Sequence, residues 1–137
     1  MEKIAKRKQE LTMEWIEGLR INREKQRMLV FLKEEGYKLA CVTNSVRETV
    51  DDMLGKIGIG HFFDIIISNQ DVTHAKPSSE GYINVMVDLT ILPSETLIVE
   101  DSPHGLMSAR NTGANVWKVW NAQEVTVKNI KEELCKY

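Results

Sequence analysis

The fold class is decided by Tyr37-Lys38-Leu39-Ala40-Cys41-Val42-Thr43-Asn44-Ser45, a short apolar run that changes to polar residues. A run of this length between Gly36 and a polar cluster is typical of a buried strand that ends in a loop. The residues Ser45-Val46-Arg47-Glu48 match a capping box, and apolar residues at one-face helical spacing follow until Gly58. The sequence therefore predicts a strand that leads into a helix through a three-residue polar turn.

The same alternation extends in both directions along the chain. A helical pattern precedes the strand and stops at Gly36, where a glycine can take the left-handed C-terminal cap. Strands alternating with helices predict an α/β fold, a Rossmann-like parallel sheet with helices on both faces. Outside the first strand and its helix at 45–57, the predicted strands are 62–68, 96–99 and 116–119, and the predicted helices are 26–35, 79–89, 104–111 and 124–137.

Composition limits the class of protein. A chain of 137 residues has room for one domain, and 42% hydrophobic with 28% charged residues is the balance of a soluble globular protein. A net charge of −2 gives no basic field for nucleic acid, and no apolar run is long enough for a membrane span. The N-terminus lacks a signal-peptide core, so we expect a cytoplasmic protein. The two cysteines, Cys41 and Cys135, are too few for a disulfide framework.

The N-terminal segment differs from the rest of the chain. Residues 1–27 carry eight Lys/Arg against five Asp/Glu, with sparse apolar residues at roughly helical spacing. This pattern predicts an amphipathic helix whose charged residues form a solvated face.

Polar clusters follow three of the predicted strands. Thr43-Asn44-Ser45 follows the first, the loop that carries His74 and Lys76 follows the second, and Glu100-Asp101-Ser102 follows the third. The carboxyl ends of parallel strands share one edge of a sheet, and ligands bind in the crevice there. The sequence therefore predicts an anion site with a divalent cation at this edge.

The chemistry of these residues suits phosphate. Backbone N–H groups at the start of the helix at Ser45 carry the positive end of the helix dipole, and Thr43 adds a hydroxyl donor. Lys76 contributes a positive charge that helps to neutralise a phosphate dianion. Magnesium prefers carboxylate and phosphate oxygens and keeps several waters, so Glu100 and Asp101 are an adequate protein contribution.

These motifs resemble those of the haloacid dehalogenase-like hydrolases, most of all the phosphatase and phosphoglucomutase subfamily with a helical cap. The resemblance covers about residues 26–120 and rests on Thr43-Asn44-Ser45, Lys76-Pro77, Val99 to Gly105, and Ala109 to Gly113, in that order. It implies phosphoryl transfer assisted by Mg²⁺ and a small phosphorylated metabolite as substrate.

The resemblance also implies a role for each site residue. Thr43 would hold the transferring phosphoryl group, and Asn44 would supply a backbone donor beside it. Lys76 would bridge the phosphate and the nucleophile. Asp101 would ligate the metal, and Glu100 would contact it directly or through another ligand.

One family motif is missing. Members of this family open with a central strand that ends in Asp-x-Asp, where the first aspartate attacks phosphorus and the second acts as acid and base. The aspartates here stand at 51, 52, 64, 71, 88 and 101, and no two are separated by a single residue. The resemblance thus predicts one domain, with residues 1–25 as a cap remnant and residues 26–137 as a truncated core without the first central strand.

Three arrangements could fill the gap in the sheet. The flanking strands could pair directly, the basic N-terminal segment could fold into the gap, or a second polypeptide could donate the strand. We favour a truncated or split phosphohydrolase that is inactive alone because the nucleophilic aspartate is absent. The alternative is a non-catalytic remnant that binds phosphate, a metal or a protein partner. Exposed strand edges also make self-association a possibility.

Overall fold

A five-stranded parallel sheet forms the middle layer of the computed structural model, which describes residues 4–6 and 19–137. The strand order is β3-β2-β1-β4-β5. The strands are β1 (Ile4–Lys6), β2 (Lys38–Val42), β3 (Ile65–Ile67), β4 (Leu97–Glu100) and β5 (Asn115–Lys118). The helices are α2 (Arg23–Glu34), α3 (Arg47–Ile57), α4 (Glu80–Asp88), α5 (Pro103–Arg110) and α6 (Val127–Leu134). Short 3-10 turns lie at Gly60–Phe62, Asn69–Asp71, Pro93–Glu95 and Ala122–Glu124.

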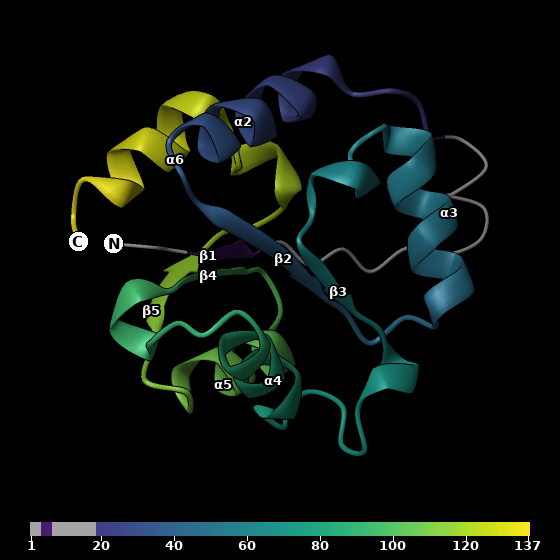
Figure 1. The fold of residues 1–137 in the computed structure, drawn as a ribbon, viewed down its shortest axis with the longest axis vertical. Helices are drawn as coiled ribbons and strands as arrows, with labels where there is room; N and C mark the ends of the chain where they lie inside the picture. The colour runs from purple at the N-terminus through teal and green to yellow at the C-terminus, as the bar shows by residue number, and fades with distance from the viewer. Residues whose placement is uncertain (1–3, 7–18) are drawn as a thin grey trace.

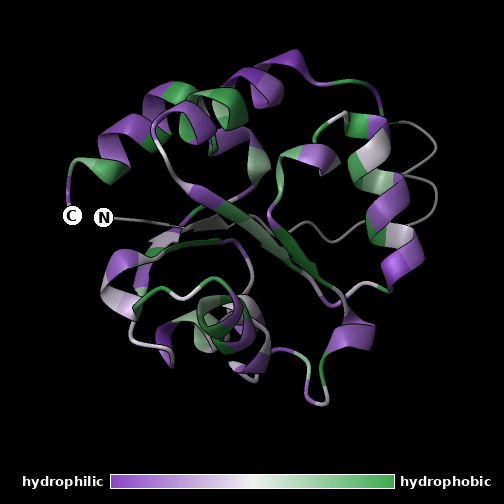
Figure 2. Cartoon of the chain, in the orientation of Figure 1, coloured by the Kyte–Doolittle hydropathy of each residue, from purple (hydrophilic) through white to green (hydrophobic). Residues whose placement is uncertain are grey.

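The helices cover both faces of the sheet, as the strand and helix alternation predicts. In Figure 1, α2 and α6 lie on one side of the strands, and α4 and α5 lie on the other. Side chains alternate along β2 in the same way, because Leu39 and Cys41 join the core under α2 and α3 while Ala40 and Val42 join the core under α4. Figure 2 shows the corresponding hydropathy, with apolar residues along the strands. The predicted α/β fold with two covered faces is therefore confirmed.

Two predicted helix ends are also confirmed. The backbone of Gly36 after α2 has φ +88°, and that of Gly58 after α3 has φ +83°. L side chains rarely adopt this left-handed region, so glycine is the residue that ends these helices at low cost.

The predicted capping box at Ser45 is wrong. Helix α3 begins at Arg47, and its N-cap residue Val46 makes no side-chain cap hydrogen bond. The side chain of Gln70 accepts a hydrogen bond from the backbone N–H of Arg47 at 3.0 Å instead. A cap from the loop after β3 satisfies this helix end, and a local sequence pattern could not indicate it.

The N-terminal segment also differs from the prediction. Residues 4–6 form strand β1, which pairs with β2 on one side and β4 on the other, and residues 19–22 precede α2 without helical structure. The rest of the predicted helix, residues 1–3 and 7–18, lies outside the described residues. The central position is thus occupied by the chain's own N-terminal segment, which is the second of the three arrangements that the sequence left open. Two buried strands need backbone partners on their facing edges, and this need outweighs a local preference for helix.

The sheet places its loops in the predicted way. All five strands are parallel, so the segments after β2, β3 and β4 leave from one edge of the sheet.

Among the described residues, no helix has the length and apolar character that crossing a membrane would require. Neither Cys41, which is buried, nor Cys135, which is exposed, forms a disulfide.

Candidate functional site

Lys76 lies where the ends of β2 and β4 meet. Its side chain leaves the loop between β3 and α4 and is only 3% exposed. The ammonium Nζ donates to the backbone oxygen of Val42 at 2.9 Å and to Oε2 of Glu100 at 2.6 Å. It also lies 4.9 Å from the centre of the Tyr82 ring. One ammonium group therefore contacts the last residue of β2, the last residue of β4 and helix α4.

Glu100 is the buried acidic partner of this lysine. Its side chain is fully buried at the end of β4, where Oε2 accepts hydrogen bonds from Lys76 and from the hydroxyl of Tyr82. The other oxygen, Oε1, has no hydrogen-bond partner among the described residues. A Cβ placed on Gly105, in the first turn of α5, would lie 2.2 Å from Oε1. The absence of a side chain at Gly105 therefore makes room for the carboxylate.

Tyr82 is held in its protonated form. Burial raises the pKa of its phenol well above the usual value, and the nearby Glu100 carboxylate raises it further. The hydroxyl therefore remains a hydrogen-bond donor to Oε2 across the physiological pH range. Tyr82 is a neutral donor, so the balancing positive charge for Glu100 comes from Lys76.

The carboxylates fit the acidic part of a magnesium site. Oε1 of Glu100 is a buried oxygen without a partner among the described residues, which is the condition under which an added cation is stabilising. Asp101 follows directly and is partly exposed beside a hollow of about 600 Å³ between α5 and the end of β5. Within the described part of the chain, no group of three acidic, histidine or cysteine side chains forms a ready-made metal site. Glu100 and Asp101 could therefore hold Mg²⁺ together with phosphate oxygens and water.

The polar residues after β2 approach Lys76 through Asn44. The side-chain oxygen of Asn44 accepts a hydrogen bond from the backbone N–H of Lys76 at 3.2 Å. Thr43 is buried, and its hydroxyl accepts from the backbone N–H of Ser45 at 3.1 Å. The structure thus brings Asn44, Lys76 and Glu100 together, with Thr43 next to Val42. Their roles as ligands, like those of Asp101, remain predictions.

Sequence reasoning missed two residues of this cluster. Tyr82 lies in the helix predicted at 79–89 and was given no role at the site, although a buried phenol needs a hydrogen-bond partner and could have been a signal. Gly105 was expected only as part of a motif. A glycine inside a predicted helix costs about 1 kcal/mol relative to alanine, and such a cost indicates a close approach by another group.

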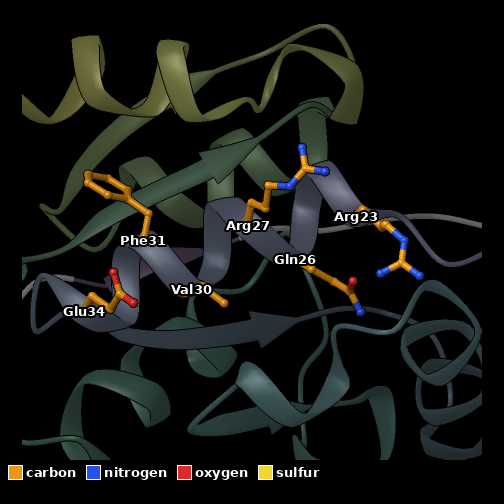
Figure 3. A pocket seen from close by; sticks show the side chains of 6 residues that line it. All are labelled: Arg23, Gln26, Arg27, Val30, Phe31 and Glu34. Carbon is orange, nitrogen blue, oxygen red and sulfur yellow. The ribbon is translucent and has the colours of Figure 1, made fainter.

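A second hollow lies on α2 and does not resemble a binding site. All of its lining residues belong to this helix, as Figure 3 shows. Two of them serve packing, because Gln26 donates to the backbone oxygen of Gly58 at 2.9 Å and the Phe31 ring lies 4.7 Å from Nζ of Lys131. The candidate site is therefore the cluster around Lys76, where described residues of the predicted polar segments meet.

Comparisons with known proteins show the family of this chain. The family model described as "Haloacid dehalogenase-like hydrolase" matches residues 1–119. The pyrophosphatase PpaX of Bacillus velezensis is 36% identical over 99 residues, which covers 69% of this chain and 46% of that protein. PpaX of Halalkalibacterium halodurans is 38% identical over 82 residues, covering 60% of this chain and 38% of that protein.

The chain also has a fold similar to that of a solved structure. The β-phosphoglucomutase of Clostridium difficile superposes with a TM-score of 0.72 at 17% identity, covering 90% of this chain and 62% of that one. The chain spans less than half the length of the two pyrophosphatases. The match to the family model includes all the polar segments that meet at Lys76. The chain belongs to the haloacid dehalogenase-like hydrolase family.

Proposed function

We propose that this chain forms the phosphate-binding and magnesium-binding side of a phosphohydrolase site for a small phosphorylated metabolite. On this proposal the chain alone does not hydrolyse its ligand. The observation that carries the proposal is the position of Lys76, which contacts the ends of β2 and β4 through Val42 and Glu100. This is the edge at which a parallel sheet binds its ligands.

Different residues of the site would bind the phosphate and the magnesium ion. Lys76 and the loop at Thr43 and Asn44 would hold the phosphate oxygens through charge and hydrogen bonds. Glu100 and Asp101 would hold Mg²⁺, which when bound neutralises phosphate charge and polarises the phosphorus–oxygen bonds. Asn44 would keep the Lys76 loop beside the end of β2 through its hydrogen bond to the Lys76 backbone.

The attacking group must come from outside this sequence for hydrolysis to occur. The family mechanism needs a carboxylate nucleophile, and this sequence contains no Asp-x-Asp pair. Strand β1 ends at Lys6, and the sequence continues with Arg7 and Lys8, which carry no carboxylate. We therefore propose a second polypeptide as the source of the aspartates in an active form.

A non-catalytic binding protein is the second candidate, and β1 favours it. The backbone of Ile4–Lys6 already pairs with both β2 and β4, where a donated strand would have to pair. A second polypeptide would have to displace β1 before it could complete the sheet. On this candidate the site binds phosphate and Mg²⁺ without turnover. The cytoplasmic location and the self-association remain predictions.

The experiment compares binding with turnover in the purified chain. We expect orthophosphate to bind in the presence of Mg²⁺, measured by calorimetry, and we expect p-nitrophenyl phosphate hydrolysis no faster than in Lys76→Ala. No phosphate binding with Mg²⁺ present would overturn the proposed function. Hydrolysis above the Lys76→Ala control would refute the need for an outside nucleophile. A neighbouring reading frame that encodes Asp-x-Asp-x-Thr would favour the split enzyme over the non-catalytic protein.

A further inference from the structure

We infer that the hollow between α5 and the end of β5 binds the organic part of the phosphorylated ligand, and that Arg110 and Lys118 select a ligand with a second negative charge. The class of ligand is thus an organic phosphate whose carbon frame carries a second anionic group, a carboxylate or another phosphoryl group. This inference rests on the proposed function, because the hollow adjoins the edge at which the phosphate would bind.

The hollow lies directly beside the candidate site. Asp101, one of its lining residues, follows Glu100, the buried partner of Lys76. Strands β4 and β5 are parallel neighbours, and their register pairs Glu100 with Lys118. Lys118 therefore lies level with Glu100 at the ligand-binding edge, and a group attached to the phosphate has the hollow next to it.

Two positively charged side chains line this hollow. Arg110 is the last residue of α5, Lys118 is the last residue of β5, and both are exposed. Among the described residues, neither forms an ion pair with an acid, so each can bind an anion without first breaking a salt bridge. Asp101 adds a negative charge to the lining, and in the proposed function Mg²⁺ neutralises it. The lining then favours an anionic group, and the guanidinium of Arg110 can bind its oxygens in a bidentate manner.

Exposed apolar side chains in the same hollow suit a carbon frame. Trp120 is 79% exposed and Met107 is 55% exposed, and both are lining residues. The ammonium of Lys118 lies 4.8 Å from the centre of the Trp120 ring, which holds the charge beside the apolar surface. The backbone N–H of Trp120 donates to Oε2 of Glu124, which fixes the turn that carries the ring.

The size of the hollow favours an organic ligand over a single inorganic ion. Its volume of about 600 Å³ lies within the range of pockets that bind small organic molecules. Such pockets combine apolar walls with a few convergent polar groups, as this hollow does with Trp120, Met107, Arg110 and Lys118.

Two aryl phosphates of nearly equal shape test the second charge. 4-Carboxyphenyl phosphate carries a carboxylate where p-nitrophenyl phosphate carries a neutral nitro group. Their dissociation constants are measured by calorimetry on the whole chain with Mg²⁺ present, together with that of orthophosphate. We expect the carboxylate to tighten binding by about fivefold or more relative to the nitro group. Hydroquinone bisphosphate, with a second phosphoryl group at the same position of the ring, shows which anionic group the hollow prefers.

Charge-removing variants locate the preference. Arg110→Gln and Lys118→Gln should each lower it, and the double variant should abolish it while changing the affinity for orthophosphate by less than about twofold. The matched control is Arg27→Gln, which removes an exposed charge from α2 on the opposite side of the sheet (Figure 1). This control should keep the preference of the wild type.

Tryptophan fluorescence gives an independent readout of the apolar contact. Because Trp120 is 79% exposed, acrylamide in solution has direct access to its ring. We expect 4-carboxyphenyl phosphate to protect the wild-type fluorescence from acrylamide quenching, and we expect this protection to be absent in Trp120→Phe. Protection that persists in Trp120→Phe would overturn the placement of the ligand against this ring.

The outcomes separate the inference from the proposed function. If orthophosphate binds with Mg²⁺ but the two aryl phosphates differ by less than about twofold, the inference is overturned and the proposed function stands. A preference that survives in the double variant, or that Arg27→Gln lowers as much as Arg110→Gln does, would also overturn the inference. If none of the phosphates binds with Mg²⁺ present, the proposed function itself fails, and the inference fails with it.

Discussion

Replacing Lys76 with methionine should lower the free energy of unfolding by about 3–5 kcal/mol, the usual cost of removing one member of a buried ion pair. The magnitude follows from the burial of the pair, since the lysine side chain is 3% exposed and that of Glu100 is fully buried. Methionine fills a similar volume, so the main loss is the charge and its hydrogen bonds to Glu100 and Val42. The Glu100 carboxylate would then remain buried with Tyr82 as its only donor among the described residues.

Urea unfolding measures this loss. With a slope of about 1–3 kcal/mol per molar urea, the midpoint should fall by more than about 1 M. The double variant Lys76→Met/Glu100→Gln should recover much of the stability, because a neutral pair leaves no uncompensated charge. The control Lys33→Met breaks an exposed pair with Asp64 and should cost less than about 1 kcal/mol. A cost for Lys76→Met no larger than that of the control would refute the reasoning.

Two further predictions concern a glycine and an aspartate. Gly105→Ala should lower the melting temperature because its Cβ would lie 2.2 Å from Oε1 of Glu100. Gly55→Ala should raise the melting temperature, because Gly55 lies inside a helix and has open space around it. Equal shifts in the two variants would contradict the close approach at Gly105. Hydrogen bonds from the backbone and hydroxyl of Ser68 hold the pKa of Asp71 below its usual range. The ionised Asp71 therefore stabilises the fold above about pH 4, and this stabilisation is lost as the pH falls through the lowered pKa. Urea unfolding of Asp71→Asn should therefore show a weaker loss of stability in acid than the wild type, and parallel pH profiles would exclude this role.

Local patterns were sufficient to predict most of the elements of this fold. Apolar runs indicated β2 and β4, and one-face spacing placed Tyr82 on the inner side of α4, where it is 1% exposed. The left-handed backbone of Gly36 followed from the need for a residue without a side chain after a helix, and the end of the next helix at Gly58 followed from the spacing of its apolar residues. These features depend on neighbours in the sequence, so a single sequence can show them.

The features that could not be predicted depend on partners distant in sequence. The cap of α3 comes from Gln70, and residues Ile4–Lys6 form a strand because β2 and β4 leave two edges to be paired. At the site, the polar clusters were predicted to meet, but the details of their contacts were not. The bond between Asn44 and the Lys76 backbone and the room that Gly105 leaves for Glu100 are visible only in three dimensions.

Lys76 has a mechanical role as well, because it joins two strands of the sheet. Within the described residues, β1 pairs with β2 as far as Ala40 and with β4 as far as Ile98, and these two neighbours continue to Val42 and Glu100. The Lys76 ammonium spans the two strands there, from the carbonyl of Val42 to the carboxylate of Glu100. A single side chain thus connects the carboxyl ends of β2 and β4, and its loss would allow these two strand ends to separate.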